Sequence, residues 1–168
     1  GKHPGKTNVT DVDGALNILR YLADRPTAVI VKHNNPCGVA QDRSLAKAYV
    51  KADLADRIAA YGGAIAVNRA LDRATAREIV KRYAEVVAAP EFGPGAMAVF
   101  EKKRNLRVMK IRRMERLAEF ASTRVVDFKS MMDGGLIAQW SFVPEARTRA
   151  ALLPAQVTMA TEVLVTME

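Results

Sequence analysis

VIVKHNNPCGVA, residues 29–40, joins an apolar run to a turn that is rich in polar groups. The preceding TAVIVK segment (27–32) is short and β-branched, which predicts a strand buried on both faces, as in a parallel sheet. Lys32 and His33 follow the apolar residues, and the Asn-Asn-Pro-Cys-Gly turn comes next. Ligands of open α/β sheets bind outside the carboxyl ends of the strands. The stretch therefore predicts a functional site where this strand ends.

Outward from this strand, helical and strand periodicities alternate along the chain. This order predicts an α/β fold with three layers, in which helices cover both faces of a mostly parallel sheet. Thr10 or Asp11 is the expected N-cap of the first helix. The 134–142 strand is a candidate for antiparallel pairing. Predicted helices cover 11–24, 43–53, 71–84 and 93–105, and predicted strands cover 27–32, 62–68, 85–90, 106–111, 122–129, 134–142 and 157–167.

The length of 168 residues and the 49% apolar content predict one domain with a real core, spanning residues 1–168. Residues 144–156 are expected to form a loop or short helix that leaves the main body. No apolar run approaches the roughly 20 residues of a membrane span, and the N-terminus has no apolar signal region. The chain starts at Gly1 without an initiator methionine, so we expect a processed chain or a piece of a longer protein.

Cys37 is the only cysteine, so an intramolecular disulfide is impossible and a reducing, cytoplasmic location is expected. The formal net charge is +8, and residues 101–116 hold eight basic residues against two acidic ones. Such a stretch is typical of a solvated face, of a site for a phosphate or polyanion, or of nucleic-acid binding. Nucleic acid ranks last, because this stretch has no aromatic residue for stacking on bases.

Lys32 and His33 carry the most suggestive chemistry. Histidine is suited to moving a proton near neutral pH, and a neighbouring lysine can stabilise a developing oxyanion. Consecutive strand residues point to opposite faces, but a turn at the strand end would let both line one crevice. The alternative is a histidine that only hydrogen-bonds the turn beside a solvated lysine. The residues alone leave both interpretations open.

A zinc deaminase is a weaker hypothesis. Those enzymes combine His-x-Glu with Pro-Cys-x-x-Cys, and zinc needs three or four ligands. Pro36–Cys37 is present, but the chain has a single cysteine and two histidines in all. Cys37 is therefore expected to be a small packed residue, and no catalytic metal is expected.

Two glycine pairs precede predicted strands. Gly62–Gly63 permits close approach of backbone or ligand, but the residues by themselves slightly favour simple turn geometry. The same alternatives hold for the MMDGG sequence at 131–135, where a β-turn is expected.

Taken together and in order, several stretches resemble the AICAR transformylase domain of the bifunctional purine-biosynthesis enzyme, AICAR transformylase/IMP cyclohydrolase. The Lys-His-x-Asn-Pro-Cys-Gly match is the most specific of them. The stretches are NVTDVDGAL (8–16), VIVKHNNPCGVA (29–40), YGGAIAVNRALDRATAREI (61–79), EVVAAP (85–90), NLRVM (105–109) and FKSMMDGGLIAQ (128–139).

This resemblance implies transfer of a formyl group from 10-formyltetrahydrofolate, the folate co-substrate, to the 5-amino group of AICAR. It implies that His33 transfers the proton and that Lys32 is an electrostatic stabiliser. The fold would be cytidine-deaminase-like but without zinc. The resemblance further implies substrate contacts at Asn35, at Gly62 or Gly63, and at Glu85.

The resemblance also implies that the chain is the first of two deaminase-like subdomains, with 144–168 as an exit segment toward the missing second one. Family members form homodimers with active sites at subunit contacts, so this chain is expected to carry half a site. A second subdomain or partner subunit would complete it, and the isolated chain can be inactive. The alternative is a non-catalytic binding or assembly module that uses residues 101–116 for an anionic partner.

Overall fold

The computed structural model describes residues 3–143. Contacts divide the chain into two compact units, residues 1–121 and 122–168. The interpretation of 1–168 as one deaminase-like subdomain stays a prediction. In chain order the elements are α1 (Lys6–Leu19), β1 (Thr27–Lys32), β2 (Asn35–Gln41), α2 (Leu45–Ala55), β3 (Ala64–Val67), α3 (Arg73–Ile79), β4 (Val86–Ala89), α4 (Pro94–Phe100), β5 (Arg107–Lys110), the 3-10 helix η1 (Met114–Ser122), β6 (Val126–Ser130) and β7 (Leu136–Trp140).

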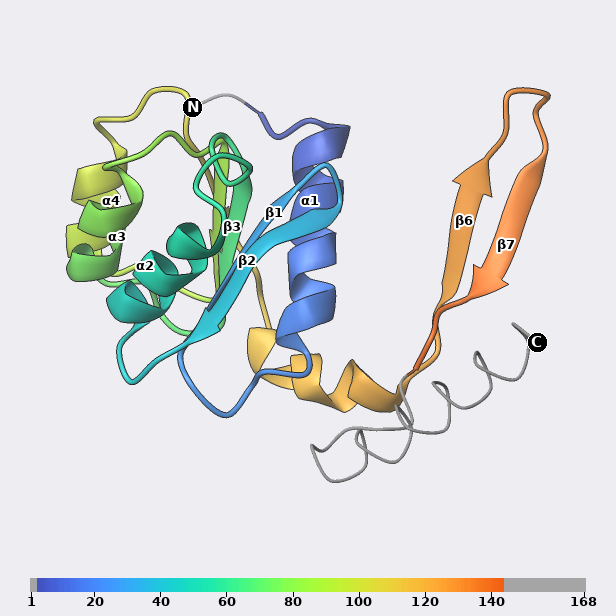
Figure 1. Ribbon diagram of the computed structural model, residues 1–168, viewed down its shortest axis with the longest axis horizontal. Helices are drawn as coiled ribbons and strands as arrows, with labels where there is room; N and C mark the ends of the chain where they lie inside the picture. The colour runs from blue at the N-terminus through green and yellow to red at the C-terminus, as the bar shows by residue number, and fades with distance from the viewer. Residues whose placement is uncertain (1–2, 144–168) are drawn as a thin grey trace, which may run out of the picture. The chain divides into compact units, whose positions relative to one another are not determined.

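The first unit is built on a five-stranded sheet in the order β2-β1-β3-β4-β5. Figure 1 labels the first three of these strands, β2, β1 and β3. The strands β3, β4 and β5 are parallel, whereas β1 is antiparallel to both β2 and β3. The predicted α/β class with a largely parallel sheet is confirmed, but the parallel pairing expected for residues 27–32 is wrong. A tight hairpin reverses the chain after β1, and α2 then carries the chain from β2 across β1 to β3.

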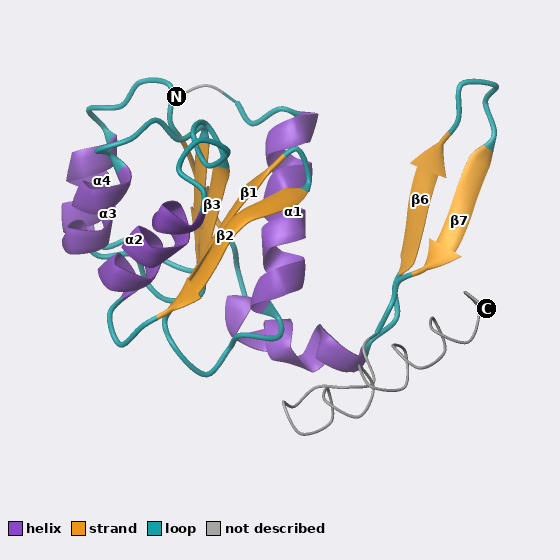
Figure 2. Ribbon diagram, viewed as in Figure 1, coloured by secondary structure: helices purple, strands orange, loops and turns teal. Residues whose placement is uncertain are grey.

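Helices cover both faces of this sheet, as predicted (Figure 2). On one face α1 packs through Val12, Ala15 and Leu19 against alternate residues of β1, β3 and β4. On the other face α2, α3 and α4 contribute Ala48, Tyr49, Ile79 and Phe100, among others, to a second core. Both faces of β1, β3 and β4 are therefore buried, which explains their unbroken apolar sequences.

The start of α1 and the existence of β2 differ from the predictions. The helix begins at Lys6, with Gly5 as its N-cap, and not at Thr10 or Asp11. The Asn8 side chain accepts a hydrogen bond from the Gly5 amide at 3.1 Å, which favours the earlier start. Residues 35–41 form an edge strand where a turn was expected, and an edge strand tolerates Pro36 because one of its sides has no ladder partner.

The helices α3 and α4 are shorter than predicted at their C-terminal ends. The backbone after Ile79 continues in turns, in which the backbone amide of Lys81 donates to the Glu78 carbonyl at 3.2 Å. The backbone after Phe100 does the same, because Lys103 donates to the Phe100 carbonyl at 2.8 Å. At its start α3 has Asp72 as N-cap, whose carboxylate accepts from the Thr75 amide at 2.7 Å.

The second unit contains an antiparallel hairpin of β6 and β7, which confirms the strands and the pairing predicted for this region. Its turn includes Gly134 at φ 85, and the Gly135 amide donates to the Asp133 carboxylate at 2.9 Å. The expected β-turn at MMDGG is thus confirmed. The strand predicted at 157–167 and the loop or helix predicted at 144–156 lie outside the described residues.

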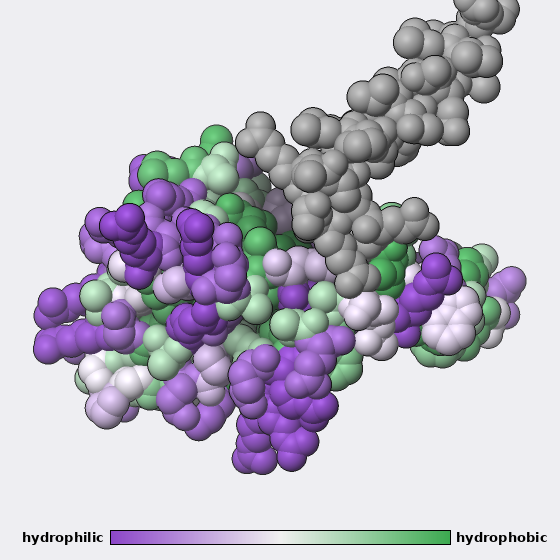
Figure 3. Space-filling view, turned by 90° about the horizontal axis from the view of Figure 1, so that it is seen from below, coloured by the Kyte–Doolittle hydropathy of each residue, from purple (hydrophilic) through white to green (hydrophobic). Residues whose placement is uncertain are grey.

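Hydrophilic side chains dominate much of the face shown in Figure 3, with apolar side chains between them. Charged residues make up 26% of the chain, and they are expected at the surface because apolar residues fill the two cores. Among the described residues, no helix combines the length and the apolar content that a membrane crossing requires.

Tyr49 lies on the core-facing side of α2 and is 4% exposed. Burial, and secondly the Asp53 carboxylate, raise the pKa of Tyr49 to about 12 from its ordinary value of 10.0. Below pH 10 the phenol is protonated in both the folded and the unfolded chain. Between pH 10 and about 12 the unfolded chain loses this proton first, so the free energy of unfolding falls.

We therefore expect Tyr49→Phe to flatten the fall in stability between pH 10 and 12. Urea unfolding followed by circular dichroism across this range measures the effect, with phenolate absorbance as a second signal. An equally steep fall in the variant would contradict the prediction.

Candidate functional site

The sheet register brings most of the predicted site residues to one end of the sheet. Val31 pairs with Ala64, Ala64 with Val86, and Val86 with Arg107. The residues next to this row, at the same end of the sheet, are Lys32, Gly63, Glu85 and Leu106. Residues that lie far apart in sequence thus meet where β1 ends and β3, β4 and β5 begin.

The position of this site corrects the expectation that it lies outside the carboxyl ends of parallel strands. Lys32 does end β1, but β1 is antiparallel to β3. The carboxyl end of β1 therefore lies beside the amino ends of β3, β4 and β5. This arrangement also explains why Gly62–Gly63 and Glu85, which precede strands, lie at the same end as Lys32, which terminates one.

His33 and Asn34 form the two-residue turn between β1 and β2. Both have positive φ, 54° and 62°, and Lys32 pairs with Asn35 across the turn. Two successive residues of this kind are the backbone of a type I′ hairpin, a conformation that is uncommon outside glycine but that asparagine and histidine adopt more often than other residues. The Asn35 amide group donates to the His33 carbonyl at 2.9 Å, which closes the turn. Non-glycine residues held at positive φ are found more often at functional positions, which agrees with a site at this turn.

The buried carboxylate of Asp11 holds this turn from α1. Its oxygens accept from the Asn34 amide at 2.7 Å and the His33 amide at 3.3 Å. Asp11 is 5% exposed, whereas the His33 side chain lies at the surface. In the described part of the chain the His33 ring has no hydrogen-bond partner. The backbone of the turn is therefore fixed while the imidazole stays open to a ligand.

Lys32 points to the adjacent loop, where its ammonium donates to the Tyr61 carbonyl at 2.8 Å. The next residue, Gly62, has φ 76°, and its amide donates to the Tyr83 carbonyl at 2.9 Å. A Cβ on Gly63 would lie 3.0 Å from the Val31 carbonyl oxygen. Both glycines are thus required by the backbone itself, so the turn-geometry interpretation holds for them whether or not a ligand also approaches here.

Glu85 is half-buried at the start of β4. One of its carboxylate oxygens, Oε2, accepts from the buried Asn8 amide at 2.9 Å. No described residue donates to the other oxygen, Oε1, so Glu85 retains acceptor capacity toward a ligand. Nearby, Arg107 donates through Nε to the His3 carbonyl at 3.3 Å.

Asn8, Asp11 and Arg107 are site residues that sequence reasoning missed. Asn8 and Asp11 stand in the NVTDVDGAL stretch, where Asp11 was interpreted as a possible helix cap. A usable signal was present, since a polar residue on the apolar side of an amphipathic helix needs a buried partner. Arg107 was counted with the basic stretch, although the structure places it at the start of β5.

Cys37 packs against the core beneath α2, and burial raises the pKa of its thiol. Both findings agree with the predicted packing role. No group of three histidine, cysteine, aspartate or glutamate side chains in residues 3–143 is arranged to hold a metal ion.

Comparison with known proteins identifies the family of the chain. The family described as AICARFT/IMPCHase bienzyme matches residues 1–166. The bifunctional purine biosynthesis protein PurH of Acaryochloris marina is 37% identical over 166 residues, covering 91% of this chain and 30% of the relative. PurH of Acetivibrio thermocellus is 40% identical over 139 residues, covering 83% of this chain and 26% of the relative.

PurH of Myxococcus xanthus is 44% identical over 109 residues, covering 65% of this chain and 21% of the relative. The chain thus spans between about a fifth and a third of the length of these relatives. The family match covers almost the whole chain, including every residue of the candidate site. The chain therefore belongs to the AICARFT/IMPCHase bienzyme family.

Proposed function

We propose that this chain carries part of a site for formyl transfer in purine biosynthesis. The formyl group would move from 10-formyltetrahydrofolate to the 5-amino group of AICAR. The observation that carries the proposal is the convergence of Lys32, His33, Gly63 and Glu85 at one end of the sheet. Membership of the AICARFT/IMPCHase bienzyme family supports the choice of reaction.

In the proposed reaction the amine nitrogen of AICAR attacks the formyl carbon. A new C–N bond forms, the bond from that carbon to the folate nitrogen breaks, and the amine loses a proton. His33 is suited to accept this proton, because its ring is exposed and free of partners among the described residues. The folate nitrogen takes up a proton as it leaves, so atoms and charge balance.

Lys32 would stabilise the oxyanion that forms on the formyl oxygen. Its ammonium carries three protons, of which one is donated to the Tyr61 carbonyl. That bond orients the ammonium and leaves two donors for a ligand. Glu85 would accept from a nucleotide amide or amine through Oε1, while Asn35 and the glycine pair shape the nucleotide contact.

In this proposal a second subdomain or a partner subunit supplies the residues that complete the site. In that arrangement the chain supplies the proton-transfer group and the oxyanion stabiliser, and a homodimer of the whole enzyme brings in the remaining substrate contacts. A non-catalytic module is the competing function, and it predicts that His33 contributes little.

Calorimetric titration of the chain with AICAR tests the proposal. We expect Lys32→Ala and His33→Ala each to weaken binding about tenfold, equivalent to roughly 1.4 kcal/mol, as for loss of a charge-assisted hydrogen bond. Lys47→Ala is the matched control, because Lys47 is exposed on α2 and away from the site residues. Equal affinity in all variants would favour the non-catalytic module. Absence of binding would show that this chain alone does not form a working site.

A further inference from the structure

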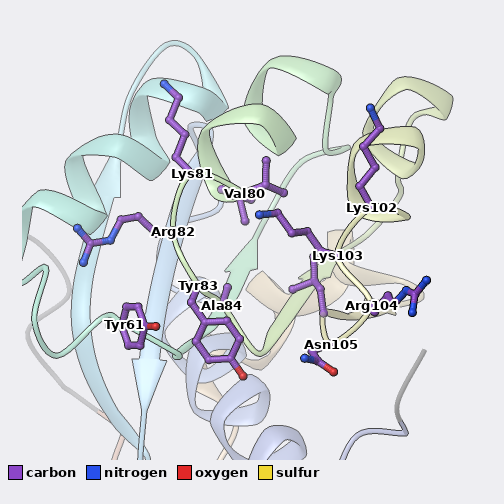
Figure 4. A pocket seen from close by; sticks show the side chains of 12 residues that line it. Tyr61, Val80, Lys81, Arg82, Tyr83, Ala84, Lys102, Lys103, Arg104 and Asn105 are labelled. Carbon is purple, nitrogen blue, oxygen red and sulfur yellow. The ribbon is translucent and has the colours of Figure 1, made fainter.

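A second concave region lies in the first unit, beside the candidate site. It is a cavity of about 650 Å³ between the turn after α3 and the loop after α4 (Figure 4). No carboxylate lines it among the residues that the structure describes. Its cationic lining residues are Lys81, Arg82, Lys102, Lys103 and Arg104.

Among the described residues, three of these five cations have no ion-pair partner. Lys81 pairs with Glu78 at 2.6 Å, and Arg82 pairs with Asp53 at 3.3 Å. Within residues 3–143, no carboxylate lies within ion-pair distance of Lys102, Lys103 or Arg104. Elsewhere in the basic stretch 101–116, Lys110 pairs with Glu91 and Arg116 with Glu119. Part of the unpaired positive charge of that stretch, on Lys102, Lys103 and Arg104, therefore lines this cavity.

The walls of the cavity are fixed by backbone hydrogen bonds. The backbone amide of Arg82 donates to the Ile79 carbonyl at 3.2 Å, and the backbone amide of Leu106 donates to the Lys103 carbonyl at 3.0 Å. At one end the rings of Tyr61 and Tyr83 lie 5.4 Å apart. Figure 4 shows the Lys103 side chain extending toward Val80 on the opposite wall, while Lys102 and Arg104 extend in other directions from the same loop. The Lys103 ammonium therefore lies over the cavity, while the other cationic side chains extend outward from ordered turns at its rim.

We propose that this cavity binds a ligand with several spaced anionic groups, such as a polyphosphate or an oligocarboxylate chain. One phosphate group would contact only one or two of these cations and would leave most of the cavity empty. Multivalent anions instead gain from each cation they reach, in a region that no lining carboxylate screens. The proposal is independent of formyl transfer, because neither Lys32 nor His33 lines the cavity.

Calorimetric titration of the full chain with inorganic tripolyphosphate, citrate and orthophosphate tests this proposal. We expect tripolyphosphate or citrate to bind at least about tenfold more tightly than orthophosphate, and affinity to fall as salt is raised. Tighter binding of tripolyphosphate would indicate a phosphate chain as the ligand, and tighter binding of citrate would indicate a carboxylate ligand. Lys103→Glu should weaken the binding of the tighter of these two anions about tenfold or more, because attraction becomes repulsion across the cavity. Lys47→Glu makes the same charge change on α2 outside the cavity and should stay within about twofold.

Equal weakening by Lys103→Glu and Lys47→Glu would overturn the proposal, since it would indicate attraction by the overall charge alone. Tighter binding of a single-stranded oligonucleotide than of tripolyphosphate, again lost in Lys103→Glu, would also overturn it in favour of a nucleic-acid surface. His33→Ala should leave tripolyphosphate binding unchanged. Loss of AICAR binding and loss of polyanion binding can therefore be distinguished.

Discussion

Gly38→Ala is expected to destabilise the fold by roughly 3 kcal/mol or more, the upper range for an overpacked core. Gly38 lies on β2, directly beneath α2. A Cβ at this position would lie 1.9 Å from the Ala52 carbonyl oxygen and 2.8 Å from its carbonyl carbon. Both are backbone atoms of a helix, so no side-chain rotation relieves the overlap. The helix must move away from the sheet, although Ala48, Tyr49 and Ala52 bury its contact face.

Urea unfolding followed by far-ultraviolet circular dichroism measures this loss as a lower midpoint. Gly14→Ala is the matched control, because Gly14 lies within α1 and its added Cβ would meet only the Val31 side chain at 3.7 Å. That variant should be stabilised by about 0.5–1 kcal/mol through the higher helix propensity of alanine. Equal midpoints for the two variants would show that α2 can move away from the sheet without loss of stability.

Asp11→Ala should lower the free energy of unfolding by about 2–3 kcal/mol, since hydrogen bonds to a charged group contribute about 1.5–3 kcal/mol each and exposed amides regain water. The Asp11 carboxylate is buried and accepts from the backbone of His33 and Asn34, which both have positive φ. Without it, nothing in α1 holds the turn in this conformation. The amides of His33 and Asn34 should then exchange with solvent at least about tenfold faster.

Two further variants make the result specific. Asp11→Asn keeps the shape and one acceptor oxygen, but its amide group opposes one backbone donor, so an intermediate loss is expected. Asp13→Ala removes an exposed carboxylate of the same helix, which within residues 3–143 accepts a single hydrogen bond, from the Asn17 amide group at 3.3 Å, and should change stability by less than about 0.5 kcal/mol. Unchanged exchange at His33 in Asp11→Ala would refute a positioning role for this carboxylate.

The sequence predicted the local elements of the sheet well. The β1 strand was predicted at its observed bounds, and β3, β4 and β5 lie within the predicted segments. Their unbroken apolar runs record burial on both faces, a property of each segment by itself. Helix ends were less well predicted, because the turns after Ile79 and Phe100 depend on neighbouring loops and not on periodicity. The edge strand β2 was missed, because Pro36 and Gly38 resemble turn residues and only the neighbouring β1 and α2 explain them.

Sequence alone predicted that Lys32 and His33 follow a buried strand and could form a site there, and the resemblance to the transformylase family added Glu85 to the predicted site. The tertiary structure decided that they meet at the amino ends of β3, β4 and β5, because a buried strand has the same apolar pattern in either direction. It also decided that Asp11, 22 residues before His33, fixes the turn that presents the histidine. Such pairing depends on how α1 packs across the sheet, which no local pattern of residues specifies.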